Sequence, residues 1–197
     1  ALLLGCKSTP VPEPESKPKP STDLRRYEYE QPEMGVPFRI VLYAKSESLA
    51  ETAAGAAFNR VAQLNAIMSD YETDSELSKL SRSSEDGSPE VPVSADLWNV
   101  LSFSQELSRK TGGGFDITIG PCSALWRQAR REQRFPDATR LENARQKIGY
   151  QNLVLNKSRR TARLLKPGMR LDLGGFAKGY AADEALKVLR RHKINRA

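Results

Sequence analysis

The sequence predicts an α+β fold in which a mixed sheet is flanked by helices. Segments with the strand period of two and segments with the helical period of about 3.6 both occur, without the regular alternation of βαβ proteins. The 197 residues have a mean hydropathy of −0.56, and this length is sufficient for one domain with its own core. No apolar run reaches the roughly 20 residues that span a bilayer.

The first elements follow in order along the chain. Residues 34–44 (MGVPFRIVLYA) alternate as a strand, and residues 47–69 carry an apolar face at steps of three and four. Residues 70–93 are expected to form a loop with one short helical turn. Ser94 is the predicted N-cap of a second helix, which the glycines at 112–114 end.

The second half opens with a short apolar segment, residues 115–119, followed by Pro121. Apolar periodicity and turn residues then predict three strands and two helices. These elements are, in order, a helix over 138–148, strands over 152–156, 161–165 and 169–173, and a helix from 176 to about 192.

The N-terminal residues divide into two segments ahead of the folded part. Residues 1–6 end in Leu3-Leu4-Gly5-Cys6, which resembles a bacterial lipobox and predicts lipidation of Cys6. Residues 7–23 hold five prolines and predict an extended tether. The folded domain then covers 24–197. A lipidated Cys6 places the protein on the bacterial cell membrane, on its periplasmic or extracytoplasmic side, whereas the alternative is a chance cysteine after a short apolar start.

Charge is unevenly distributed along the chain. Residues 1–125 carry 12 Lys/Arg against 18 Asp/Glu, net −6, and residues 126–197 carry 19 against 6, net +13. Few aromatic residues accompany the arginines such as Arg127 and Arg130, so a solvated basic face is favoured over a nucleic-acid site. The single histidine, His192, lies on a basic helix end where it suits the helix dipole better than a catalytic role.

Two segments place an aspartate beside glycines, at 112–118 and 171–180. Glycines allow close approach of a ligand to the backbone, and the start of the last helix offers free N–H groups and Lys178 to a phosphate. Aspartates beside a phosphate indicate a divalent cation or a hydrogen-bonded sugar. The structural alternatives are a helix C-cap, a tight strand-to-helix turn and, for Tyr71, a core aromatic.

Four segments in series resemble the ApbE family of FAD:protein FMN transferases, over about residues 34–197. The segments are MGVPFRIVLYA (34–44), MSDYETDSEL (68–77), GFDITIGP (114–121) with Leu125-Trp126, and LDLGGFAKGYAAD (171–183). The resemblance implies an ApbE-like fold and assigns roles to eight residues. Those implied to contact the flavin nucleotide are Met34, Tyr71, Gly114, Phe115, Asp116, Asp172 and Lys178, and Gly175 is implied to bind Mg²⁺ through its carbonyl. Val36 replaces the threonine usual after Met-Gly.

The resemblance also implies a reaction, in which FMN moves from FAD to a threonine in a subunit of a membrane redox complex, with magnesium as cofactor. Alternatives are a non-catalytic flavin-binding lipoprotein and one that hydrolyses FAD. Family motifs expected further downstream, a His-x-x-Asp-Pro segment and an Asp…Thr pair, are absent from the sequence. We therefore expect the N-terminal part of the family's domain, truncated at its C-terminal side, with unassigned catalytic residues and no activity in residues 1–197 alone. No nucleic-acid partner is expected.

Overall fold

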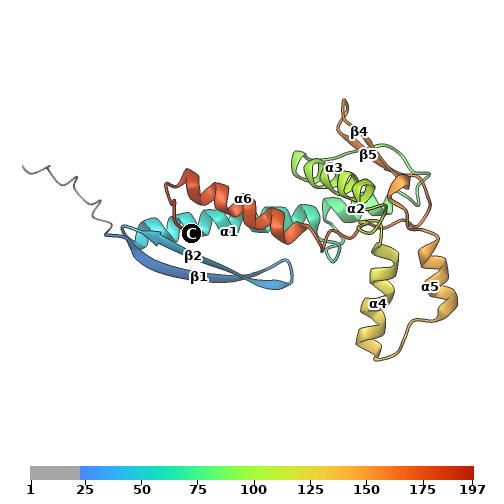
Figure 1. The fold of residues 1–197 in the computed structure, drawn as a ribbon, viewed down its shortest axis with the longest axis horizontal. Coiled ribbons are helices and arrows are strands. Elements are labelled where there is room, and N and C mark those ends of the chain that lie inside the picture. The colour runs from blue at the N-terminus through green and yellow to red at the C-terminus, as the bar shows by residue number, and fades with distance from the viewer. Residues whose placement is uncertain (1–22) are drawn as a thin grey trace, which may run out of the picture.

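The computed structural model describes residues 23–197 (Figure 1). The predicted lipidation site Cys6 and residues 7–22 of the predicted tether lie outside this part of the chain. The α+β class with flanking helices is confirmed, and the strands are distributed over two small sheets. No helix of the described residues combines the length and the apolar character needed to cross a membrane.

The first sheet is an antiparallel hairpin of β1 (Arg25–Glu33) and β2 (Val36–Ala44), with Glu33 opposite Val36. The residues between the strands, Met34 and Gly35, have φ of 51° and 73°, the conformation of a two-residue hairpin turn. The prediction that the strand begins at Met34 was therefore wrong by two residues. Strand β1 was not predicted, because its alternation rests on tyrosines among charged residues rather than on aliphatic side chains.

The second sheet has the order β3-β5-β4, with β3 (Val91–Pro92), β4 (Leu153–Asn156) and β5 (Thr161–Leu164). The predicted hairpin is confirmed as β4 and β5, which pair antiparallel. The predicted third strand at 169–173 is wrong, because β3 lies beside β5 instead. Residues 169–173 approach another segment, through an isolated parallel bridge between Ile119 and Arg170.

Helices α1 (Glu47–Met68) and α6 (Ala177–Arg191) run side by side in opposite directions above the β1–β2 hairpin (Figure 1). Small residues on the buried face of each helix allow the two backbones to approach closely. These residues are Ala50, Ala53, Ala54 and Ala57 in α1 and Ala177, Ala181 and Ala185 in α6. The pairing brings the end of α1 to the start of α6.

The remaining helices lie at the other end of the molecule (Figure 1). They are α2 (Glu76–Arg82), α3 (Ala95–Lys110), α4 (Gly120–Glu132), α5 (Ala138–Arg145) and the 3₁₀ helix η1 (Tyr150–Asn152). Ser94 caps α3 as predicted, with its hydroxyl accepting a hydrogen bond from the amide of Leu97. Helix α4 was not predicted, because its sequence is rich in arginine and holds few large apolar residues.

An ion-pair cluster ties α1, α3 and α6 together. Arg60 of α1 donates hydrogen bonds to both carboxylate oxygens of Asp96 (2.6 and 2.9 Å) and to Glu184 (2.7 Å). The Tyr180 hydroxyl donates a further bond to Asp96 (2.9 Å). Hydrogen bonding to Arg60 holds the pKa of Asp96 below its usual value. The side chains of Arg60, Asp96 and Glu184 are only 12–20% exposed, so each depends on the others for its charge balance.

We expect Arg60→Ala in the intact protein to lower the free energy of unfolding by about 3 kcal/mol, because it leaves two partly buried carboxylates without their cation. Arg39→Ala is the matched control, since Arg39 pairs with Glu28 in an exposed position. Its effect should be below about 1 kcal/mol. Equal effects of the two variants in urea denaturation would contradict a structural role for the cluster.

Candidate functional site

A cavity of about 980 Å³ lies where the end of α1, the β1–β2 turn, α4 and the start of α6 meet. Its volume is at the upper end of the range of small-molecule sites, about 300–1,000 Å³. All eight residues that the sequence assigned to the nucleotide or the metal line this one cavity: Met34, Tyr71, Gly114, Phe115, Asp116, Asp172, Gly175 and Lys178. Residues separated by up to 144 positions in the sequence are thus brought to one site.

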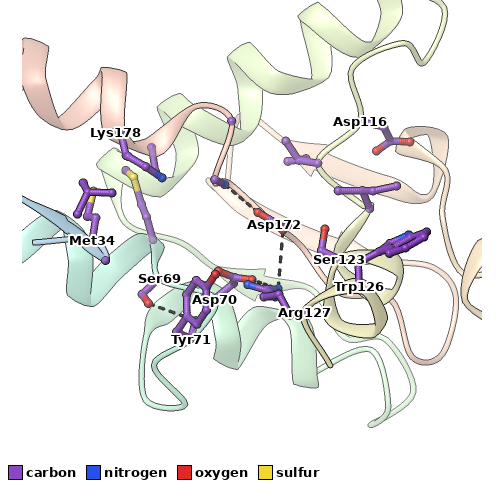
Figure 2. Close-up of a pocket in the computed structure, with 18 of the residues that line it drawn as sticks. Met34, Ser69, Asp70, Tyr71, Asp116, Ser123, Trp126, Arg127, Asp172 and Lys178 are labelled. Atoms are coloured by element: carbon purple, nitrogen blue, oxygen red, sulfur yellow. Dashed lines mark hydrogen bonds and ion pairs between the residues drawn. The ribbon is translucent and has the colours of Figure 1, made fainter. Parts of the chain in front are cut away.

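The loop after α1 carries Tyr71 to the cavity. The Ser69 hydroxyl caps the turn by accepting hydrogen bonds from the amides of Tyr71 and Glu72, each at 3.2 Å. Tyr71 is 74% exposed, so the alternative that it is a core aromatic is wrong. Its ring lies at the edge of the cavity, as Figure 2 shows, where a planar ligand can reach it.

The two glycine–aspartate segments lie side by side. The amide of Asp172 donates to the carbonyl of Ile117 (2.8 Å), and the bridge between Ile119 and Arg170 continues the contact. At Gly120 the approach is so close that a Cβ atom would lie 2.5 Å from the Arg170 carbonyl oxygen. A glycine is therefore required where α4 begins.

The two aspartates have different environments. The Asp116 carboxylate accepts hydrogen bonds from the amide and hydroxyl of Thr118 (2.8 and 2.7 Å) and from the amide of Tyr150 (2.9 Å). Oδ1 thus closes the loop after α3 on itself, and Oδ2 holds this loop against η1. In Figure 2 the side chain lies away from Asp172. Its contact with a nucleotide stays a prediction.

The Asp172 carboxylate belongs to the cavity wall and to the start of α6. One of its oxygens accepts a hydrogen bond from the amide of Gly174 (2.8 Å), and its side chain is 17% exposed. Phe176, the N-cap of α6, gives no side-chain hydrogen bond to the first turn. The amides of Phe176 and Ala177 donate to the Leu173 carbonyl, so the helix dipole and the exposed Lys178 are what favours an anionic group on this side of the cavity.

Arg127 of α4 is the residue that the sequence analysis missed. Its guanidinium forms an ion pair with Asp70, lies 3.8 Å from a carboxylate oxygen of Asp172, and stands 4.5 Å from the centroid of the Tyr71 ring (Figure 2). Its side chain is 23% exposed, so its assignment to a solvated basic face was wrong. Burial alone would lower the pKa of Arg127, but the hydrogen bond to Asp70 raises it above its usual value. The guanidinium is therefore always charged.

A signal for Arg127 exists in the sequence, because it directly follows the Leu125-Trp126 pair that resembles the family motif. The same helix carries Arg130 and Arg131 as well. Its position after this pair does not by itself indicate a role, since the partners of Arg127 come from two distant loops.

The described residues fit a magnesium site only in part. Within residues 23–197, no three histidine, cysteine, aspartate or glutamate side chains gather as metal ligands. The carboxylates of Asp70 and Asp172 both face the guanidinium of Arg127. The carbonyl of Gly175 stays the one predicted ligand, and we assign no chemical step to a metal.

Two other side chains, Cys122 and His192, are poor candidates for catalysis. Cys122 is 6% exposed, and burial raises the pKa of its thiol, so it is a poor nucleophile. His192 caps the far end of α6, about 22 Å along the helix from its first turn. It does not line the cavity.

Comparison with known proteins finds relatives of this chain. Residues 34–197 match the family model described as the ApbE family. An FAD:protein FMN transferase of Klebsiella pneumoniae is 27% identical over 176 residues, which cover 89% of this chain and 54% of that protein. One of Haemophilus influenzae is 32% identical over 130 residues, covering 64% of this chain and 37% of that protein. The chain thus spans about half or less of the length of these relatives.

Solved structures show the same fold. The ApbE protein of Thermotoga maritima superposes with a TM-score of 0.76 at 25% identity, over 85% of this chain and 53% of that one. The flavin transferase ApbE of Vibrio cholerae gives the same TM-score at 24% identity, over 87% of this chain and 55% of that one. The arrangement of helices and small sheets is therefore shared beyond the matched motifs.

We expect Gly120→Ala to lower the free energy of unfolding by about 2 kcal/mol, because the new methyl group overlaps the backbone at Arg170. Gly55→Ala in α1 is the control, since a Cβ atom there meets nothing within 4 Å. It should raise stability by about 0.5–1 kcal/mol through helix propensity. Thermal unfolding of the intact protein measures both, and stabilisation by Gly120→Ala would contradict the close approach.

Proposed function

The chain belongs to the ApbE family, and we propose that the intact protein is an FAD:protein FMN transferase. The convergence of eight separately predicted residues on one cavity is the observation that supports the proposal. In the proposed reaction, a threonine hydroxyl oxygen of the acceptor bonds to the FMN-side phosphorus of FAD. The bond from that phosphorus to the bridging oxygen breaks, AMP leaves with this oxygen, and the hydroxyl proton is released.

The residues of the cavity have binding and orienting roles in this proposal. The positive end of the α6 dipole, at a first turn without a side-chain cap, and the amine of Lys178 attract the pyrophosphate of FAD. The exposed ring of Tyr71 offers an apolar face to a planar ring of the nucleotide. Asp172, held by the amide of Gly174, accepts a hydrogen bond from the nucleotide.

Magnesium is part of the proposal, with the carbonyl of Gly175 as one ligand. When bound, the ion would offset negative charge on the phosphate oxygens. Magnesium commonly keeps several waters and takes phosphate oxygens as ligands, so one protein carbonyl would need further ligands beyond those of the described residues.

We also propose the acceptor and the location of the protein. The acceptor is a threonine in a subunit of a membrane redox complex. Lipidation of Cys6 attaches the protein to the bacterial membrane on the periplasmic or extracytoplasmic side, and residues 7–23 act as a tether that gives the cavity reach above the bilayer. Both statements rest on sequence resemblance.

We expect Asp172→Ala in the intact protein to abolish FMN transfer while the fold is retained, because the first turn of α6 loses the carboxylate that faces the nucleotide. Asp183→Ala on the exposed face of the same helix should transfer at the wild-type rate. Covalent flavin fluorescence of the acceptor on a denaturing gel measures transfer. Near-normal transfer by Asp172→Ala would remove Asp172 from the site, and wild-type release of free FMN without a labelled acceptor would favour FAD hydrolysis.

A separate prediction concerns the anchor. Cys6→Ser in the complete precursor should move the protein from the membrane fraction to the supernatant, because the thiol that accepts the lipid is gone. Cys122→Ser serves as the control and should stay in the membrane fraction. If Cys6→Ser also sediments with membranes after a high-salt wash, lipidation at Cys6 is not the anchor.

A further inference from the structure

We propose that Arg127 is a positioning residue that holds the Tyr71 ring as a stacking surface and offsets the charge of Asp70 and Asp172 beside the nucleotide phosphates. This inference rests on the proposed function, because it takes a flavin nucleotide as the ligand of the cavity. It concerns a residue of α4 that neither the composition nor the motif roles single out.

Arg127 covers one face of the Tyr71 ring. The guanidinium carbon of Arg127 lies 4.5 Å from the ring centroid, so the cation covers one face of the ring. Tyr71 is nonetheless 74% exposed, which leaves its other face open. A ring held on one side and free on the other is a preformed surface for a planar heteroaromatic group, because its orientation is fixed before the ligand arrives.

Arg127 also lies beside two carboxylates of the cavity wall. Asp70 follows α1 and Asp172 precedes α6, so two carboxylates from distant segments face one side of the cavity. Without a cation between them they would repel each other and the phosphates of a nucleotide. Arg127 pairs with Asp70 and lies 3.8 Å from Asp172, while Lys178 stands on the opposite wall near Met34 (Figure 2). The guanidinium therefore makes this acidic wall compatible with an anionic ligand.

Planarity distinguishes Arg127 from a simple counter-charge. A lysine at this position could pair with one carboxylate, but its ammonium is a point charge that cannot lie flat on a ring. The two functions, stacking and charge balance, are thus separable by substitution. Arg127→Lys keeps the charge and loses the flat contact, whereas Arg127→Ala loses both.

The test measures binding of FAD to the intact protein, with the circular dichroism of the bound flavin as a second readout that reports ring stacking. We expect Arg127→Ala to raise the Kd for FAD about tenfold or more and Arg127→Lys to raise it less, with altered flavin dichroism in both. Arg131→Ala, one turn further along α4, outside the cavity lining and exposed, should match wild type. Tyr71→Ala combined with Arg127→Ala should raise the Kd by less than the product of the two single effects, because part of the Arg127 effect acts through the Tyr71 ring.

Three results would overturn the inference. They are a change in Kd below about twofold for Arg127→Ala, single effects of Arg127 and Tyr71 that multiply in the double variant, and a lowered Tm with unchanged Kd and dichroism in both Arg127 variants. If Arg127→Ala does not fold, Arg127→Lys alone decides by its Kd and dichroism. Wild-type protein that binds FAD but transfers no FMN contradicts the proposed function alone, whereas wild-type protein that binds no FAD contradicts both.

Discussion

The packing of α1 against α6 is the constraint on which the rest of the structure depends. Alanines on the facing sides let the two helices lie close together, and the Arg60 cluster fixes α3 to the same pair. Because the helices run in opposite directions, the loop after α1 meets the turn before α6 (Figure 1). The cavity forms at this meeting point. Tyr71 and Lys178, far apart in the sequence, therefore share one site because the packing of the two helices positions both of them.

A second contact closes the site from the other side. The segment after α3 and the segment before α6 run alongside each other, and Gly120 allows α4 to start against the backbone at Arg170. The two similar glycine–aspartate segments consequently have complementary roles. Asp116 accepts hydrogen bonds from Thr118 and Tyr150 and so holds its loop in place, whereas Asp172 accepts one from Gly174 and lies beside Arg127. Similar local sequence thus gives two carboxylates with different hydrogen-bond partners, and only their three-dimensional neighbours distinguish them.

The sequence predicted elements whose stability is local and missed features that depend on distant partners. Helix α1 and the Ser94 cap follow from periodicity and capping chemistry within one segment. Strand β1 was missed because tyrosines among charges give a weak pattern, and residues 169–173 were taken as a strand because a short apolar run does not reveal its pairing partner. Eight of the residues that line the cavity were predicted through motif resemblance, yet Arg127 was not, because its role depends on two loops that the sequence does not place beside α4.

The central claim is that this cavity binds a flavin nucleotide with its ring at Tyr71 and its phosphates at the start of α6. The balance of charges supports that orientation, since Lys178 and the positive end of the α6 dipole lie at one wall and the stacking surface at another. A crystal structure of the intact protein with FAD tests it most directly. We predict nucleotide density between these two walls, with a planar ring against the free face of Tyr71. Density elsewhere on the protein, or phosphates remote from the first turn of α6, would contradict the account.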